Sequence, residues 1–265
     1  MTDETQAPRT AVVIPAAGRG VRLGPGTPKA LRTLHGTPML VHAVRAMAAS
    51  RAVTLVVVVA PPDGVAEVRA MVDDHLHPTE APSFAPARAG GGDETDIVVV
   101  AGGETRQESV RRGLDALPAD VTTVLVHDAA RPLVPVDIVD GVVAAVRGGA
   151  PAVVPGLPLS DTVKEVGALA EGATGPGEPV VATPERARLR AVQTPQGFDR
   201  EALDRAHRQG PVQGEGATDD AGLCERLGLP VVVVPGHEEA FKVTRPLDLV
   251  LAEAVLARRR ANDGY

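Results

Sequence analysis

Apolar and polar residues follow each other along the chain in blocks that predict strands and helices by turns. Four apolar runs rich in β-branched residues come early, and each is nearly continuous, which is typical of strands covered on both faces. These runs lie at 10–15, 52–60, 96–103 and 121–128, and a fifth lies at 150–156. Stretches with apolar residues at helical spacing lie at 37–50, 62–76, 105–117 and 135–149. The pattern predicts an α/β protein with a doubly wound, mainly parallel sheet.

The alternation breaks at residues 157–194, where two extended segments flank a glycine-rich turn. Such a ribbon cannot bury a face by itself, so we expect an arm that projects from the domain and packs against a partner subunit. We treat 10–256 as one domain that contains this arm. Its last elements are predicted as helices at 199–209, 218–227 and 246–261 and a strand at 229–236. The segment 77–95, rich in Pro, Gly and Ala, predicts a mobile surface loop.

Composition narrows the classes of function. A chain of 265 residues, of which 44% are hydrophobic, can bury a large core. Aromatic residues make up only 2% and the formal net charge is −7, which together argue against a nucleic-acid binder. The single cysteine, Cys224, excludes an internal disulfide framework and is expected to fill the core. The polar first residues and the short apolar runs predict a cytoplasmic protein that does not enter a membrane.

The loop after the first strand carries the parts of a triphosphate cradle, in the stretch VVIPAAGRGVRLGPGTPK at 12–29. Gly18 and the glycines after it let backbone amides approach phosphate oxygens, and Arg22 and Lys29 supply positive charge. Leu23 stands where a dinucleotide-binding loop has its third glycine, so that motif is rejected. Taken by itself, the stretch is equally compatible with an ordinary mobile loop whose charges are solvated.

Polar residues also follow the later strands, and in a parallel sheet ligands bind beyond the carboxyl ends of the strands. Asp128, after the fourth strand, is suited to hold a ribose hydroxyl or to orient Mg²⁺ through water, although it could equally cap the loop. His127 beside it is expected to be a hydrogen-bonded structural residue. Gly103 lies in a tight turn with Ser109 within reach, so that backbone amides there suit the edge of a base.

Several other residues have structural interpretations. Thr37, followed by Pro38, stands where a helix is predicted to begin, and so do Thr105 and Thr218. Threonine is a good N-cap residue, so all three are expected to cap helices. Lys242 follows the last predicted strand in the motif FKVTRP, and a lone lysine in a loop is usually a solvated charge.

The motifs together resemble those of a known family, although no single one of them is specific. PAAGRGVRL, GGETRQESV, VHDAARP, SDTVKEV, QTPQGF, ATDDA and FKVTRPLDL occur in the order found in the 2-C-methyl-D-erythritol 4-phosphate cytidylyltransferases. The resemblance covers residues 10–256 and implies a Rossmann-like nucleotidyltransferase fold. It implies transfer of CMP from CTP to a polyol monophosphate, with release of pyrophosphate, by a homodimer that uses Mg²⁺.

The resemblance also implies roles for individual residues. The positions that match the family's catalytic cations are Arg22, Lys29 and Lys242. Those that match its CTP-binding positions are Pro15, Ala16, Ala17, Gly18, Gly103, Ser109 and Asp128. Those that match its substrate-side positions are Arg131, Thr162, Arg186, Thr194 and Thr218, of which Thr162 and Arg186 lie on the predicted arm.

Two other functions remain open from the sequence. A related cytidylyltransferase could act on another alditol phosphate, such as ribitol 5-phosphate, although PAAG rather than AGG favours methylerythritol phosphate. A non-catalytic nucleotide-sensing module could use the same scaffold. A sensor has no need to keep Arg22, Lys29, Asp128 and Lys242 together, which favours an enzyme.

Overall fold

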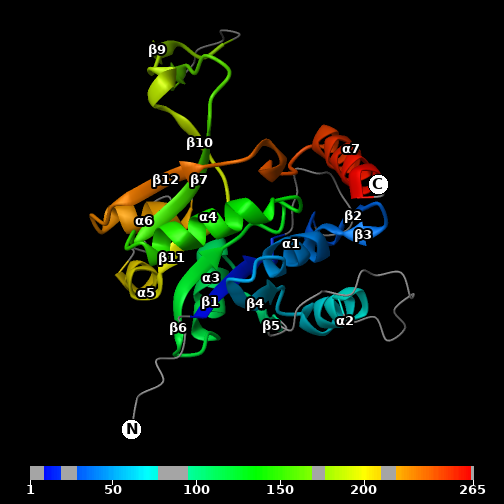
Figure 1. Cartoon of the computed structure of the whole chain (residues 1–265). Coiled ribbons are helices and arrows are strands. Elements are labelled where there is room, and N and C mark those ends of the chain that lie inside the picture. The colour runs from blue at the N-terminus through cyan, green and yellow to red at the C-terminus, as the bar shows by residue number, and fades with distance from the viewer. Residues whose placement is uncertain (1–8, 19–28, 77–94, 169–176, 210–218, 264–265) are drawn as a thin grey trace.

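The computed structural model describes residues 9–18, 29–76, 95–168, 177–209 and 219–263, and its centre is a mainly parallel sheet (Figure 1). The order is β10-β7-β11-β6-β1-β4-β5, and β12 pairs with β7. The parallel block consists of β6 (Val121–Val126), β1 (Arg9–Pro15), β4 (Val53–Ala60) and β5 (Asp96–Ala101). The second parallel pair is β7 (Ala152–Pro158) and β12 (Val231–Pro235). The predicted fold class is confirmed.

Helices cover both faces of this sheet, which explains why its strands are apolar at almost every position. Val12 and Ile14 of β1 pack in one buried cluster, and Ala11 and Val13, which point to the opposite face, pack in another. The first face is covered by α1 (Met39–Ala48), α2 (Val65–Leu76) and α4 (Val136–Arg147). The second is covered by α3 (Arg106–Asp115), α5 (Arg200–Gln209) and α6 (Asp220–Arg226). Cys224 lies buried in this second layer, as expected.

Two short antiparallel strands lie beside β7. One of them, β11, joins the parallel blocks and is absent from the predicted pattern, whereas the other, β10, falls within the extended segments predicted at 157–194. β11 (Gln196–Asp199) lies between β6 and β7 and is antiparallel to both, and β10 (Arg190–Val192) pairs with β7. Both strands are short, so neither gives a recognisable apolar run. β11 carries the chain from the arm back into the middle of the sheet, beside the end of β6.

The predicted helix N-caps are only partly correct. Thr105 caps α3 by accepting a hydrogen bond from the Glu108 amide, as expected. Thr37 does not cap a helix, because β3 (Thr37–Pro38) forms a small hairpin with β2 (Thr33–Leu34) and α1 begins only at Met39. Asp219 caps α6, whereas Thr218 lies outside the described residues.

The C-terminal helix α7 (Pro246–Asp263) forms a small third cluster with the β2–β3 hairpin. Leu34, Met39 and Val243 are buried there, which fixes the segment before α7 against the body of the sheet. No helix in the described part of the chain is both long and apolar enough to span a bilayer. The predicted mobile loop at 77–95 lies, apart from its last residue, outside the described residues.

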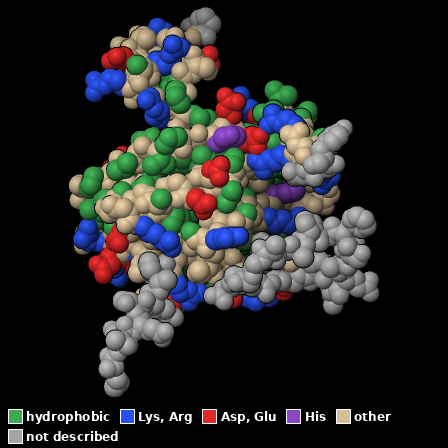
Figure 2. Space-filling model, viewed as in Figure 1, with side chains coloured by type: hydrophobic (Ala, Val, Ile, Leu, Met, Phe, Trp, Pro, Cys, Tyr) green, Lys and Arg blue, Asp and Glu red, His purple; other side chains and the backbone are tan. Residues whose placement is uncertain are grey.

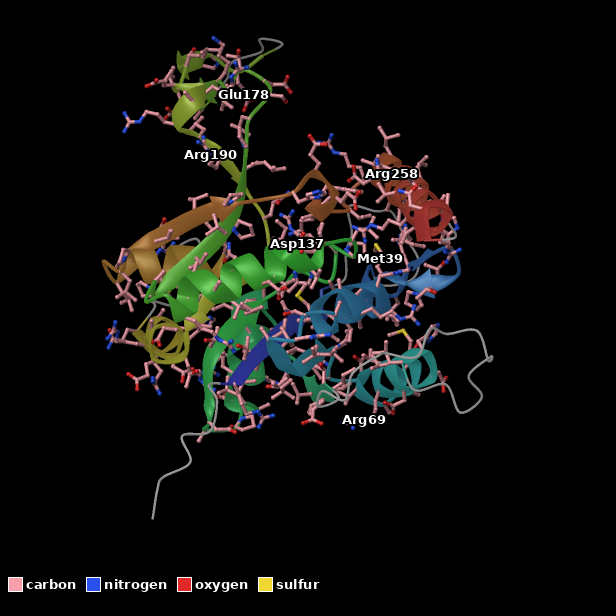
Figure 3. All side chains as sticks on the ribbon, in the orientation of Figure 1. Met39, Arg69, Asp137, Glu178, Arg190 and Arg258 are labelled. Atoms are coloured by element: carbon pink, nitrogen blue, oxygen red, sulfur yellow. The ribbon has the colours of Figure 1, made fainter. Side chains whose placement is uncertain are left out.

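A small two-stranded sheet stands away from the central sheet at the place of the expected arm (Figure 1). It consists of β8 (Glu165–Val166) and β9 (Val180–Ala182), followed by the 3-10 turn η3 (Arg186–Arg188). All residues of these three elements are exposed, and Figure 3 shows Glu178 along the arm and Arg190 at its base. These elements of the arm therefore bury little of their own surface.

Buried polar contacts fix the end of β6. His127 is fully buried, and its Nε2 lies 3.1 Å from the carbonyl oxygen of Arg131, to which it donates. Its Nδ1 lies 3.0 Å from Oγ1 of Thr194, which also accepts a hydrogen bond from the Asp128 amide at 3.0 Å. Burial lowers the pKa of His127 to about 4, so the ring is neutral at pH 7. His127 is thus the hydrogen-bonded structural residue expected from the sequence.

Close packing of α3 on the sheet generates a prediction about Gly113. A Cβ at this position would lie 2.5 Å from Cγ1 of Val13, whereas a Cβ at Gly141 in α4 would meet no atom within 4 Å. Gly113→Ala should lower the free energy of unfolding by about 1–3 kcal/mol through overpacking. Gly141→Ala, the matched control, should raise it by up to about 1 kcal/mol. Denaturant titration measures both, and equal effects would contradict the close packing.

The neutral state of His127 generates a prediction about pH. The pKa of His127 is about 4 when folded and about 6.5 when unfolded, so the unfolded chain takes up the proton first as pH falls. The free energy of unfolding should therefore decrease as pH falls from about 6.5 to about 4, by at most about 1.4 kcal/mol per pH unit from this group. In the His127→Gln variant, the free energy of unfolding should change less steeply with pH over this range, whatever the stability of the variant at pH 7. An unchanged slope in chemical denaturation would show that His127 does not titrate this way.

Candidate active site

A cavity of about 270 Å³ opens at the carboxyl ends of β1, β5 and β6. Its lining includes every described residue that the sequence assigned to CTP, together with one of the predicted catalytic cations. These residues are Pro15, Ala16, Ala17, Gly18, Gly103, Ser109, Asp128 and Lys242. They come from four segments that are far apart in the sequence, and the parallel strands bring them to one edge of the sheet.

Two tight turns build the wall of this cavity after β1 and β5. The Ala16 amide donates to the Val59 carbonyl at 2.8 Å, and the Gly102 amide donates to the Ala60 carbonyl at 2.7 Å. A Cβ on Gly102 would lie 2.9 Å from Oγ of Ser109 and 3.1 Å from the Ala60 oxygen, so the approach of the two turns requires glycine there. The buried Ser109 hydroxyl accepts from the Gly103 amide at 3.1 Å and holds the turn against α3.

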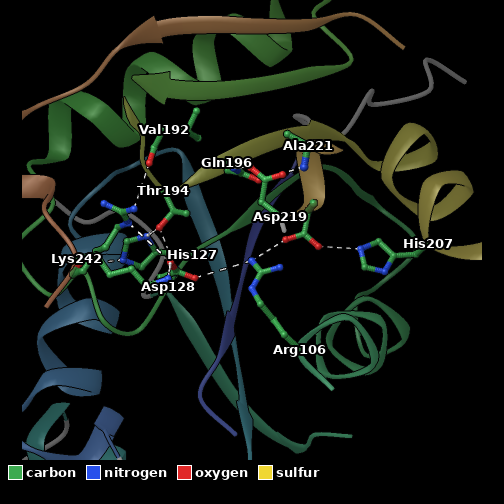
Figure 4. Close-up of polar contacts among 12 residues, drawn as sticks. Arg106, His127, Asp128, Val192, Thr194, Gln196, His207, Asp219, Ala221 and Lys242 are labelled. Carbon is green, nitrogen blue, oxygen red and sulfur yellow. Dashed lines mark hydrogen bonds and ion pairs between the residues drawn. The ribbon is translucent and has the colours of Figure 1, made fainter. Parts of the chain in front are cut away.

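Asp128 is the electrostatic centre of the site (Figure 4). Its Oδ2 lies 2.7 Å from Nζ of Lys242 and 3.8 Å from Nε of Arg131, and its Oδ1 lies 3.9 Å from Nη2 of Arg106. Burial alone would raise the pKa of Asp128, but Lys242 and Arg106 outweigh it and lower this pKa to about 2. Asp128 therefore carries a full negative charge at neutral pH among three cations.

Lys242 reaches Asp128 because several contacts fix the segment on both sides of it. The Val243 amide donates to the Ala130 carbonyl at 2.8 Å, which ties this segment to the loop after β6. Gln193 binds His237 in both directions, donating to its carbonyl at 2.9 Å and accepting from its amide at 3.0 Å. Glu239 in the 3-10 turn η4 (Glu238–Ala240) pairs with Arg259 of α7. Lys242 is thus held in the cavity wall and paired with Asp128, although its side chain is still 39% exposed to solvent.

Arg131 and Thr194, predicted on the substrate side, serve in this chain as internal connections. Arg131 donates from Nη1 to the Ala240 carbonyl at 2.7 Å and from Nη2 to the Val192 carbonyl at 3.3 Å. Thr194 is buried and connects His127 with the Asp128 amide. Both residues border the Asp128 group, and a direct contact of either with substrate stays a prediction.

The remaining predicted residues are not among the described residues that line this cavity. Thr162 and Arg186 are exposed on the arm, where Arg186 donates to the Ser160 carbonyl. Lys29 begins the 3-10 turn η2 (Lys29–Leu31), and its neighbour Ala30 lines the cavity. Arg22 and Thr218 lie outside the described residues.

Sequence reasoning missed three residues that shape the site. Arg106 lines the cavity and forms an ion pair of 2.8 Å with Asp220 of α6. Gln196 donates to Oδ2 of Asp219 at 2.7 Å and accepts from the Ala221 amide at 3.2 Å, which fixes the start of α6 (Figure 4). Gln193 fixes the segment before Lys242 through its two hydrogen bonds with His237. The sequence features that could have identified these residues are an arginine directly after the capping Thr105 and two glutamines in the QTPQ motif.

A family model, related sequences and a solved structure all match this chain, and all three carry the same family name. The family model described as 2-C-methyl-D-erythritol 4-phosphate cytidylyltransferase matches residues 10–258. Proteins of that name from Streptomyces avermitilis and Streptomyces coelicolor are 70% and 71% identical over 259 residues, covering 97% of this chain and 95% and 88% of theirs. The crystal structure of the Thermus thermophilus protein of that name superimposes with a TM-score of 0.65 at 36% identity, covering 93% of this chain and 98% of that one. The chain belongs to the 2-C-methyl-D-erythritol 4-phosphate cytidylyltransferase family.

Proposed function

We propose that the cavity at the ends of β1, β5 and β6 is where CTP binds in the family's reaction. The chain transfers CMP from CTP to 2-C-methyl-D-erythritol 4-phosphate, a step of isoprenoid biosynthesis, and releases pyrophosphate. The observation that carries the proposed location is the ionised Asp128 paired with Lys242 beside two backbone turns at one sheet edge. Such an edge offers amides to a base, a carboxylate to a ribose and cations to phosphates.

The reaction poses an electrostatic problem that the site is suited to solve. The attacking phosphate is anionic at neutral pH, so no general base is needed, but it must approach another anion. Two like unit charges about 4 Å apart repel by roughly 4 kcal/mol at an effective dielectric constant near 20. Fixed positive charge around the α-phosphate offsets this repulsion and stabilises the transition state. We assign this role to Lys242, with Arg22 and Lys29 from the opening loop.

The residues fit a bound Mg²⁺ ion. Magnesium commonly binds through one or two carboxylates together with substrate phosphates and water, rather than in a cage made of protein ligands alone. In the described part of the chain no group of three or more His, Cys, Asp or Glu side chains could hold a metal, whereas Asp128 is ionised and lines the cavity. When bound with CTP, Mg²⁺ would neutralise part of the triphosphate charge. We assign to Asp128 the role of holding it, directly or through water.

The arm supplies the substrate side of the site to a partner subunit in this proposal. Thr162 and Arg186 lie on the arm and are not among the described residues that line the cavity of their own chain, which supports their assignment to the cavity of a second copy. Exposed apolar side chains, among them Val192 and Val233, lie at the base of the arm and on β12, as Figure 2 shows for this face. They are suited to pack in a homodimer. One catalytic domain over 10–256 and a cytoplasmic location stay predictions.

Pyrophosphate release tests the proposed function. With CTP and Mg²⁺, the protein should release pyrophosphate with 2-C-methyl-D-erythritol 4-phosphate and far more slowly with ribitol 5-phosphate. A preference for ribitol 5-phosphate would show a different acceptor, and release with neither would indicate a nucleotide sensor.

The pairing of Lys242 generates the first prediction from the proposed site. Lys242→Ala should lower kcat roughly 10²–10³-fold, the usual loss for one strong transition-state donor. Arg111→Ala, which removes an exposed charge of α3, is the control for net charge and should keep the wild-type rate. Steady-state pyrophosphate release measures both. A Lys242→Ala enzyme with more than half of the wild-type kcat would remove Lys242 from the mechanism.

The arm generates a second prediction. Arg186→Ala should raise KM for the methylerythritol phosphate about tenfold or more, with little change for CTP, because an arginine–phosphate contact is lost. Arg188→Ala, in the same 3-10 turn, is the matched control. Separate titrations of the two substrates measure the effects, and equal losses for both would contradict the assignment.

Complementation between subunits makes this test sharper. A heterodimer of Lys242→Ala and Arg186→Ala chains contains one site with both residues intact if the arm crosses to the partner. With the methylerythritol phosphate kept well below its KM, mixing and reassembling the two variants should therefore recover about a quarter of the wild-type activity, since half of the dimers are mixed and each mixed dimer has one complete site. No recovery from fully exchanged subunits would show that the arm does not serve the partner's site.

A further inference from the structure

A chain of alternating charges extends from the cavity into the second helical layer (Figure 4). Arg106 lines the cavity, and its Nη2 lies 2.8 Å from Oδ2 of Asp220. Oδ1 of Asp220 in turn lies 3.0 Å from Nε2 of His207 on α5. Asp220 and His207 do not line the cavity, and their side chains are 1% and 2% exposed. Among the described residues, Arg106 is the contact that connects these two side chains with the cavity.

The buried Asp220 needs partners for its charge, and Arg106 and His207 supply them. An ionised carboxylate away from water is costly unless it is paired and hydrogen-bonded. Burial alone would raise the pKa of Asp220, but the hydrogen bond from His207 and the charge of Arg106 outweigh it and lower this pKa. Asp220 therefore stays ionised and attracts the guanidinium group of Arg106 strongly.

His207 donates a hydrogen bond to Asp220 from a fixed position on α5. Its Nε2 faces the carboxylate, whereas its Nδ1 is buried and has no hydrogen-bond partner among the described residues. The ring orients one oxygen of Asp220 and leaves the other oxygen for Arg106.

Arg106 stands between two carboxylates. Its Nη2 is 2.8 Å from Asp220 but 3.9 Å from Asp128, so the buried carboxylate holds it more closely. Arg106 approaches Oδ1 of Asp128, whereas Lys242 lies 2.7 Å from the other oxygen, Oδ2. Without the charge on Asp220, we expect Arg106 to move closer to Oδ1 and to weaken the pair between Asp128 and Lys242.

We propose that His207 and Asp220 are positioning residues that hold Arg106 in the wall of the CTP site and keep it from Asp128. This inference rests on the proposed location of the CTP site. Arg106 then presents a fixed positive charge to an oxygen of the nucleotide, and the network behind it sets the affinity for CTP but not for the polyol phosphate.

Kinetics of the full-length enzyme test the proposal. Arg106→Ala should raise KM for CTP roughly 10- to 100-fold, the range for losing a charged hydrogen bond. Asp220→Asn and His207→Ala should each raise it about fivefold or more, with KM for the methylerythritol phosphate nearly unchanged. His207→Gln should restore most of the affinity, because the glutamine amide can replace Nε2 as donor to Asp220.

Two measurements separate positioning from loss of stability. Leu203→Ala removes a buried side chain of α5 that lies in the hydrophobic core, so it should lower thermal stability without raising KM for CTP. In an Arg106→Ala background, Asp220→Asn should cause no further rise in KM, since it acts only through that arginine. Equal effects of Asp220→Asn in both backgrounds would overturn the proposal.

The outcome also distinguishes this inference from the proposed CTP site. A rise in KM with Arg106→Ala, but wild-type values with Asp220→Asn and His207→Ala, overturns the positioning role alone. Unchanged KM for CTP in Arg106→Ala overturns both the positioning role and the placement of CTP against this wall.

Discussion

The ionised carboxylate of Asp128 at the end of β6 is the interaction on which the site depends. It draws Lys242 from the last loop to within 2.7 Å and lies within 4 Å of Arg131 and Arg106. Cations gathered without such an anion would repel one another, so the site could not be arranged before its ligand arrives. In the proposed CTP site, a highly charged nucleotide meets positive groups that are already in place, which reduces the reorganisation needed for catalysis.

Buried hydrogen bonds hold in place the segments that surround Asp128. Two buried glutamines on either side of Thr194 each hold a distant segment: Gln193 fixes the loop before Lys242, and Gln196 fixes the start of α6 with Asp219. Both lie at or near β11, which is antiparallel and sits between β6 and β7. One short strand thus connects the nucleotide side of the site with the base of the arm and with α6.

Most of the fold and the inner edge of the site could be predicted from the sequence. Continuous β-branched runs identify β1, β4, β5, β6 and β7 because helices cover both faces of these strands. Short segments such as β11, and the hairpin that displaces Thr37 from a helix cap, were missed because their structure depends on partners far along the chain. Arg106 was missed for a similar reason, since its partner Asp220 is more than a hundred residues away.

Interactions between residues close in the chain thus determine the secondary structure, whereas interactions between distant residues determine how the charged side chains pair. By itself the sequence determined the strand and helix pattern, the turns at the strand ends and the motif that carries Asp128, because these follow from periodicity and from residues close in the chain. Only the tertiary structure decided which partner each cation meets: Lys242 pairs with Asp128, Arg106 pairs with Asp220, and Arg131 donates to the carbonyls of Ala240 and Val192. Such pairings depend on distance and burial, and these exist only after the sheet and its two helical layers have assembled.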